Sequence, residues 1–471
     1  MSNTAGASHN PGQNPGVTDE GMITKFLRAT EIDTRMLGMI VALLVIWVGF
    51  DIYSGILRPG PGIFGGSFLW PRNLWILLVQ TSTIAVMTTG MVLIIVMRHI
   101  DLSVGSMLSL VAVATGVLQV FNLGPALGVG HPAIWLIAVV FAVALGALIG
   151  CFNGFLIAYA KIPSFIVTLG GLIAFGGSAF LIASGVTVAP MDKTFKIIGG
   201  NGPLASIGPF WSWALGLLAC AGIVFAIMNG RRQRTRFKFP LRPVWAEIFI
   251  GIVGCFVALG ATAVVNSYPW PHKVAEVYAL ENQITIPAGV ENADGAAICM
   301  AAEKVIKCAD GLLFQTGYPI PVLIALAVGF LMTFIANRTR FGRYVFAIGG
   351  NPEAAELAGI NTKKLTMLVF TLMGALVGIS AVIASARLDA ATTALGTLSE
   401  LYVIAAAVIG GTSLAGGIGT IYGAMLGALL MQSLQSGMTL LNFESAYKDI
   451  VVGSVLVFAV FVDQVYRRRV K

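Results

Sequence analysis

Charged residues are scarce in this sequence. Only 11% of its 471 residues are Asp, Glu, Lys or Arg, whereas hydrophobic residues make up 57%. Globular domains in water carry about 25% charged residues, so the composition excludes an ordinary water-soluble protein. Apolar runs of about 20 residues, the length of a helix that crosses a bilayer, recur along the chain. They predict an all-α polytopic membrane protein.

Residues that perform catalysis or bind metals are also few. The four histidines are scattered, so no cluster has the ligand spacing of a metal site: His9, His99, His131 and His272. No GxxxxGK[ST] motif occurs, which excludes a P-loop in this chain. No nucleophile stands beside a base in any recognisable pattern. We therefore expect no catalytic residue, no metal site and no cofactor.

Cysteine is sparse, with five residues in the whole chain. Three fall in apolar stretches, where cysteine is usually a packing residue: Cys151, Cys220 and Cys255. Cys299 and Cys308 lie in a polar insertion, residues 268–318, expected on the outer side. An oxidising compartment favours a disulfide between them, with free thiols as the alternative. One continuous helix would place the two on opposite faces, so the bond requires a turn between them.

About twelve membrane crossings are expected. Their approximate bounds are 36–55, 73–97, 102–121, 132–158, 163–185, 210–229, 244–266, 319–337, 364–385, 401–415, 419–441 and 447–464. The second and tenth run into glycine- and serine-rich breaks, IDLSVGS at 100–106 and GGTSLAGGIGT at 410–420. Irregular backbone at membrane depth must be buried in protein or line a cavity. These breaks therefore indicate re-entrant or discontinuous helices.

Glycines at intervals of four residues predict close helix packing, because small residues let two helices approach. They form three groups: Gly146, Gly150 and Gly154; Gly374 and Gly378; Gly419, Gly423 and Gly427.

Lys and Arg set the expected orientation. Most of the 29 fall in segments that share the side of the amino terminus, and the positive-inside rule then places both termini in the cytoplasm. Residues 1–35 form a disordered or amphipathic cytoplasmic segment, 36–464 the transmembrane domain and 465–471 a basic tail. The basic run RRQRTRFK at 231–238 lies between two crossings, which favours contact with anionic lipid over nucleic acid.

A polar segment at 349–361, GGNPEAAELAGIN, separates two long apolar stretches. Asn351 can cap a helix through its side-chain oxygen, and Pro352 suits the first helical position. Glu353 places negative charge at the positive end of the helix dipole. Gly359 suits a left-handed stop. These signals predict a short, well-capped helix inside a cytoplasmic loop, residues 337–364.

The expected helix, residues 352–358, has about two turns and is too short to be stable alone in water. One face is small and apolar, formed by Ala354, Leu357 and Ala358. Such a helix between membrane crossings favours docking into another protein, and an ordinary structured loop is the alternative.

Several motifs together resemble one family. They are GGNPEAAELAGIN, the following ELYVIAAAVIGGTSLAGGIGT at 400–420, IDLSVGS, the pair Asn153-Gly154, and KIPSFIVTLGGL at 161–172. In this order they resemble the permease subunits of bacterial ATP-binding-cassette sugar importers of the ribose/xylose type, from about residue 75 to 462 without the insertion. An added pair of crossings near 210–266 resembles the xylose permeases, so the expected solute is D-xylose or a related pentose.

The resemblance implies a machine in the bacterial inner membrane. Two permease copies would form the pathway, and a periplasmic binding protein would deliver the sugar. A separate ATPase subunit, using ATP and magnesium, would grip the short helix. The implied ATPase-coupling residues are Asn351, Pro352, Glu353, Ala354, Ala355, Glu356, Leu357, Ala358 and Gly359.

The two glycine-rich breaks are expected near the translocation pathway or the seam between two copies. The candidate residues are Asp101, Ser103, Gly105, Asn153, Ser413 and Gly416. The alternative is that the glycines only allow close packing, and that Asp101 caps a helix near the cytoplasmic interface. The sequence departs from the family at Tyr402, where an Asp is usual, and in the cysteine-bearing insertion.

A secondary active sugar symporter is the alternative function. Such a carrier needs ionisable groups facing the interior of its helix bundle. Most charges in this sequence fall at expected interfaces, which favours the ATP-driven importer.

Overall fold

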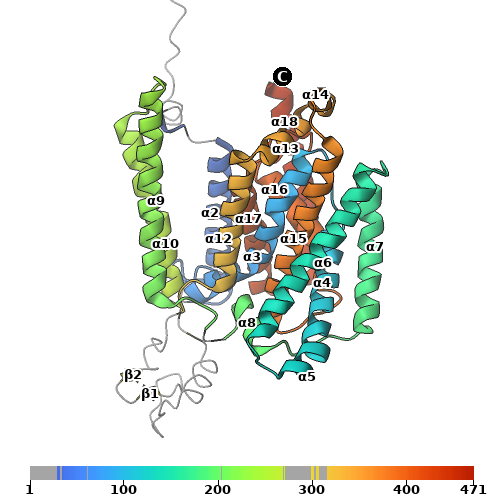
Figure 1. The fold of residues 1–471 in the computed structure, drawn as a ribbon. Coiled ribbons are helices and arrows are strands. Elements are labelled where there is room, and N and C mark those ends of the chain that lie inside the picture. The colour runs from blue at the N-terminus through green and yellow to red at the C-terminus, as the bar shows by residue number, and fades with distance from the viewer. Residues whose placement is uncertain are drawn as a thin grey trace, which may run out of the picture.

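The computed structural model describes residues 29–31, 34–60, 62–202, 204–268, 270, 299–301, 304–306 and 316–470. They form a bundle of long helices (Figure 1). The first half of the chain holds α2 (Thr34–Leu57), α3 (Pro71–Val96), α4 (Val104–Val117), α5 (Gly124–Leu127), α6 (Ala133–Ala158), α7 (Ser164–Ala183), α8 (Lys193–Lys196), α9 (Gly208–Arg236) and α10 (Val244–Asn266). A π-helical turn, Leu118–Leu123, joins α4 to α5, and a 3-10 turn, Ile197–Gly199, follows α8.

The second half holds two short antiparallel strands and the remaining helices. These are β1 (Cys299–Ala301), β2 (Lys304–Ile306), α12 (Ile320–Arg338), α13 (Arg340–Gly350), α14 (Pro352–Leu357), α15 (Thr362–Leu388), α16 (Ser399–Ile409), α17 (Ile421–Leu440) and α18 (Ser445–Val470). The expected all-α polytopic class is confirmed, since nine helices of the described chain are long and apolar enough to cross a membrane.

The twelve expected crossings are not all matched, because α16, α17 and α18, at the tenth to twelfth, are not among the nine described helices that are long and apolar enough to cross a membrane. The tenth, 401–415, holds only α16, whose 11 residues span about 16 Å, half of the roughly 30 Å hydrocarbon core. That stretch is therefore not a continuous spanning helix. The sixth, 210–229, continues to Arg236, because Arg, Gln and Lys are good helix formers and carry the helix through the basic run.

Glycine contacts bring pairs of helices together as expected. A Cβ on Gly146 or Gly150 of α6 would collide with the backbone of Gly374 or Phe370 on α15. Gly427 of α17 lies in the same way against the backbone of α16. These contacts surround α3, which is the most deeply buried of the long helices.

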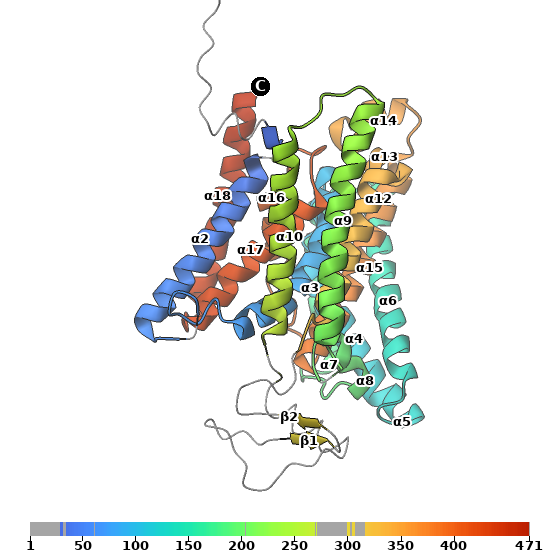
Figure 2. The ribbon, with the colours of Figure 1, turned by 90° about the vertical axis from the view of Figure 1, so that its left-hand side faces the viewer.

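The bundle has two distinct ends (Figures 1 and 2). We call them the α14 end, where α14, the α9–α10 turn and the carboxyl terminus lie, and the α5 end, where α5, α8 and the β strands lie. The α9–α10 pair stands at the left edge of the bundle in Figure 1 and faces the viewer in Figure 2, so it lies on the outside of the bundle.

At the α14 end, an ion-pair cluster fixes the α9–α10 turn to the segment that precedes α2. Both carboxylate oxygens of Glu31 accept hydrogen bonds from Arg234, at 2.8 and 2.6 Å, and Arg242 donates two more to Oε2, at 3.0 and 2.8 Å. Hydrogen bonds from Arg234, then Arg242, lower the pKa of Glu31 to about 2. The carboxylate therefore stays charged, and this contact persists, at any pH well above 2.

The structure bears only on part of the expected disulfide. β1 pairs antiparallel with β2, Cys299 lying opposite Ile306, so the chain does reverse after Cys299 as the bond requires. Cys308 lies outside the described residues, as do residues 1–28 of the expected amino-terminal segment.

Candidate functional site

The predicted docking helix is present as α14. The Asn351 side chain accepts a hydrogen bond from the Ala354 N–H at 3.1 Å, and Gly359 takes the left-handed conformation with φ +81°. The helix ends at Leu357, one residue earlier than expected. Its inner side is fixed by Ala355, which is buried in the main core.

The outer face of α14 is open. Leu357 is 91% exposed, and the other members of the predicted apolar face, Ala354 and Ala358, are exposed too. A leucine held in the open on a capped helix of six residues gains nothing from burial within its own chain. This geometry suits contact with a second protein.

A helix that was not predicted, α13, precedes α14 and packs against it. It is amphipathic, with Val345 and Ile348 buried and Arg343 and Tyr344 exposed. A Thr339 side chain caps its start by accepting from the Gly342 N–H at 3.2 Å. The spacing of its apolar residues by three and four is a helical signal that could have been found in the sequence.

Arg98, which follows the C-cap residue of α3, binds the carboxyl-terminal end of α13. Its Nε donates to the Gly349 carbonyl at 2.9 Å and its Nη2 to the Gly350 carbonyl at 2.7 Å. The last carbonyls of a helix lack intrahelical partners and carry the negative end of its dipole, so a guanidinium stabilises them. The base of the loop at 337–364, called the coupling loop after its proposed role, is therefore fastened to the end of α3.

The glycine-rich break at 410–420 joins this contact. Gly417 N–H donates to the Val96 carbonyl at 3.0 Å, and Gly416, with φ +87°, lies against Arg98 and Gly349. Ser413 is fully buried and hydrogen-bonds within the loop, its Oγ accepting from Ala415 N–H at 3.2 Å. Ser413 and Gly416 thus lie at the α14 end, in close-packed backbone.

Three other candidates meet in a second polar cluster. Asp101 is 1% exposed, and its Oδ1 accepts from the Ser103 N–H at 2.9 Å and from Ser103 Oγ at 2.6 Å. Asn153 of α6 donates to Ser103 Oγ at 3.2 Å. The residue at the N-cap of α4 is Ser103, so Asp101 stabilises the turn before the helix instead of capping it.

Gly105, the remaining candidate, marks where two irregular segments meet. It lies against the backbone of Gly396 and the carboxylate of Glu400. The Gly396 N–H donates to Ser109 Oγ at 2.8 Å. Residues 389–398, expected as an outer loop, therefore fold back to α4, and protein side chains satisfy their backbone, as irregular structure within a bundle requires.

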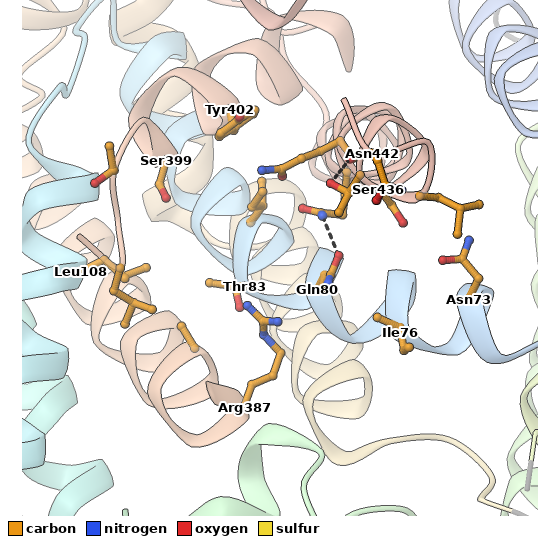
Figure 3. Close-up of a pocket in the computed structure, with 18 residues that line it drawn as sticks. Asn73, Ile76, Gln80, Thr83, Leu108, Arg387, Ser399, Tyr402, Ser436 and Asn442 are labelled. Atoms are coloured by element: carbon orange, nitrogen blue, oxygen red, sulfur yellow. Dashed lines mark hydrogen bonds between the residues drawn. The ribbon is translucent and has the colours of Figure 1, made fainter. Parts of the chain in front are cut away.

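A polar cavity of about 580 Å³, which none of these six candidates lines, is shown in Figure 3. Its walls come from α3, α4, the end of α15, the segment before α16, α16 itself, α17 and the residues just after it. The lining consists of Asn73, Ile76, Gln80, Thr83, Ile84, Leu108, Ala384, Arg387, Leu395, Thr397, Ser399, Tyr402, Gln432, Gln435, Ser436, Thr439, Leu440 and Asn442.

This cavity was not predicted from the sequence, although a pattern of polar residues on α17 indicates it. On α17, polar side chains recur with helical spacing at Gln432, Gln435, Ser436 and Thr439, inside an otherwise apolar stretch. Positions separated by three and four share one helix face. A polar stripe along a membrane-spanning helix favours a water-filled or solute-binding wall.

The fold defines a class, that of polytopic membrane proteins, and α14 is a short helix with an exposed face. The comparisons agree. The family described as "branched-chain amino acid transport system / permease component" matches residues 73–460, and the chain belongs to this permease family. The resemblance inferred from its motifs is confirmed, and the chain is a transport permease, not an enzyme.

Individual relatives are similar over most of their length. The xylose transport system permease protein XylH of Haemophilus influenzae is 33% identical over 90% of this chain and 95% of its own. XylH of Escherichia coli K12 is 35% identical over 86% and 88%. The ribose import permease protein RbsC of the same strain is 30% identical over 84% and 87%. No solved structure matches.

Proposed function

We propose that this chain is the membrane-spanning permease of an ATP-driven monosaccharide importer. The proposed substrate is D-xylose or a related pentose. Relatives named for xylose and ribose transport, similar along nearly the whole chain, support this choice. In this proposal a periplasmic binding protein delivers the sugar, two permease copies form the pathway, and the complex lies in the bacterial inner membrane.

The geometry of α14 carries the proposal. The α14 end faces the cytoplasm, where an ATPase subunit binds the exposed face around Leu357 and supplies ATP and magnesium chemistry that this chain does not perform. Because Arg98 fastens the base of the coupling loop to α3, a displacement of α14 by the ATPase reaches the centre of the bundle. The ATPase needs about 5.5 kcal/mol of differential interaction to move a two-state permease from 1:99 to 99:1.

Uptake of labelled D-xylose by cells that express the chain with its native partners tests the proposal. We expect uptake to continue when a protonophore collapses the proton gradient while ATP is maintained, and to stop when ATP is depleted. The opposite result would identify the symporter alternative. Absence of pentose uptake under both conditions, with uptake of another solute, would overturn the substrate assignment.

A further inference from the structure

The cavity has the chemistry of a site for a polyhydroxylated solute. Amide side chains stand on two facing helices: Asn73 and Gln80 on α3, and Gln432 and Gln435 on α17. Gln432 Nε2 donates to Gln80 Oε1 at 3.0 Å across the cavity, as Figure 3 shows. Amides and hydroxyls both donate and accept hydrogen bonds, as do sugar hydroxyls.

Arg387 adds a charge that nothing in the described protein neutralises. It is the one charged side chain among the described lining residues, and its Nε is buried without a hydrogen-bond partner. The neighbouring carboxylate of Asp389 is already held by Lys196 Nζ at 2.6 Å. The guanidinium points toward Thr83 (Figure 3), whose Oγ1 is also buried without a partner.

Two unpaired polar groups on one cavity wall point to a ligand. A buried donor without a partner costs free energy, and native structures leave few such groups unsatisfied. The volume, about 580 Å³, falls within the range of small-molecule sites, about 300–1,000 Å³. It accommodates one monosaccharide with water.

We infer that this cavity is a solute-binding site on the translocation pathway, and that Arg387 is its charged hydrogen-bond donor and its filter against cationic solutes. This assignment rests on the proposed transport of sugars. The guanidinium donates to hydroxyl or ring oxygens of a neutral sugar while the amides of α3 and α17 hold the remaining hydroxyls. The same charge repels a solute that carries an ammonium group.

Uptake measurements test the role of Arg387. In Arg387→Gln we expect D-xylose uptake to fall about tenfold or more, the size of effect expected for a hydrogen bond to a charged group. Arg387→Lys keeps the charge but loses the planar fork, so its uptake lies in between. The matched control is Arg72→Gln, which removes an exposed charge next to Asn73 without touching the lining. Equal uptake in Arg387→Gln and wild type would overturn the assignment.

Thiol labelling tests the cavity without relying on transport. Thr397→Cys, at the exposed part of the lining, is labelled with a membrane-impermeant maleimide and read by mass spectrometry of its own peptide. We expect millimolar D-xylose to slow labelling at least threefold, and 2-amino-2-deoxy-D-xylose, which carries an ammonium group, to have no effect. In Thr397→Cys/Arg387→Gln the two sugars should act alike. Thr187→Cys, at an exposed position after the end of α7, is the control.

The two proposals fail in different ways. If the wild type imports no sugar but D-xylose still protects Thr397→Cys, the cavity binds sugar and only the proposed transport is wrong. If uptake is normal but no sugar alters labelling of Thr397→Cys, the cavity is not the solute site.

Discussion

Leu357 is the residue on which coupling depends most directly in the proposed mechanism. It is almost fully exposed, on a helix whose own cap and buried Ala355 keep it in place. Removing it therefore costs the permease little stability, because no apolar contact within the chain is lost. What it contributes belongs to an interface with another protein.

For Leu357→Asp we expect ATP-driven uptake to fall at least tenfold at unchanged expression, since a charge in the centre of an apolar contact must be desolvated. ATPase activity measured in the assembled complex should lose its stimulation by sugar. Leu241→Asp, an exposed leucine in the α9–α10 turn, is the control and should transport normally. Normal transport in Leu357→Asp would contradict the docking role.

Asp51 illustrates a residue whose role is purely structural. It is fully buried near the end of α2, and its two carboxylate oxygens accept from Phe64 N–H at 3.0 Å and Leu69 N–H at 2.9 Å. A carboxylate within an apolar helix is costly unless it is hydrogen-bonded, and here it holds the segment between α2 and α3.

Asp51→Ala leaves two backbone N–H groups unpaired. We expect the free energy of unfolding to drop by about 2–6 kcal/mol, at about 1–3 kcal/mol for each buried unsatisfied group. The purified permease in detergent should show this as a lower melting temperature. Asp51→Asn retains one acceptor and should lose about half as much. The exposed Asp449→Ala should change nothing, and a melting temperature of Asp51→Ala equal to wild type would refute the role.

Among the elements, α13 and α3 form the joint that the coupling mechanism requires. Arg98 supplies two hydrogen bonds to the last carbonyls of α13, and its own backbone has φ +65°. This unusual conformation for a non-glycine residue aims the guanidinium at the coupling loop.

Arg98→Ala removes both bonds while leaving α14 and its exposed face intact. The ATPase should still bind, because Leu357 is unchanged, but uptake should fall about tenfold since α14 can move without moving α3. Binding is measured by co-purification of the ATPase, and transport by D-xylose uptake. Arg343→Ala, on the exposed face of α13, is the control. Loss of co-purification in Arg98→Ala would show that the residue shapes the docking surface itself.

The elements also show what sequence reasoning reaches. Long apolar helices such as α10, expected at 244–266 and observed at Val244–Asn266, follow directly from the length that the bilayer demands. The cap and stop of α14 follow from Asn351 and Gly359. The fold-back of residues 389–398 could not be predicted, because it depends on Ser109 and Gly105, which are distant in sequence. The cavity was missed for the same reason, since its walls come from five separate helices.

At the scale of the whole molecule, the two ends of the bundle differ in charge and in what they expose. The α14 end carries the basic α9–α10 turn with its Arg234 and Arg242 ion pairs. The α5 end carries β1 and β2 of the polar insertion. Positive charge accumulates on cytoplasmic loops, which supports the orientation proposed for transport.

Reporter fusions check that orientation. At Lys238, a reporter enzyme that works only in the cytoplasm should be active. At Ala293, a reporter enzyme that works only in the periplasm should be active. An insertion after Lys238, the last residue of the basic run, is preferred to an earlier one because α9 extends to Arg236. The reverse pattern at either position would invert the orientation and exclude an ATPase at α14.

The single helix α3 has a thermodynamic consequence. Over 26 residues, about 39 Å, it lines the cavity with residues between Asn73 and Ile84 and leads to Arg98 just beyond its far end. Coupling between two binding equilibria is reciprocal. If a molecule in the cavity resists a tilt of α3, it must therefore alter the affinity of the ATPase for nucleotide. Nucleotide must then alter the affinity of the cavity for that molecule by the same factor. In the proposed complex, a sugar analogue too large to pass would therefore change the affinity of the ATPase for nucleotide from the opposite side of the membrane.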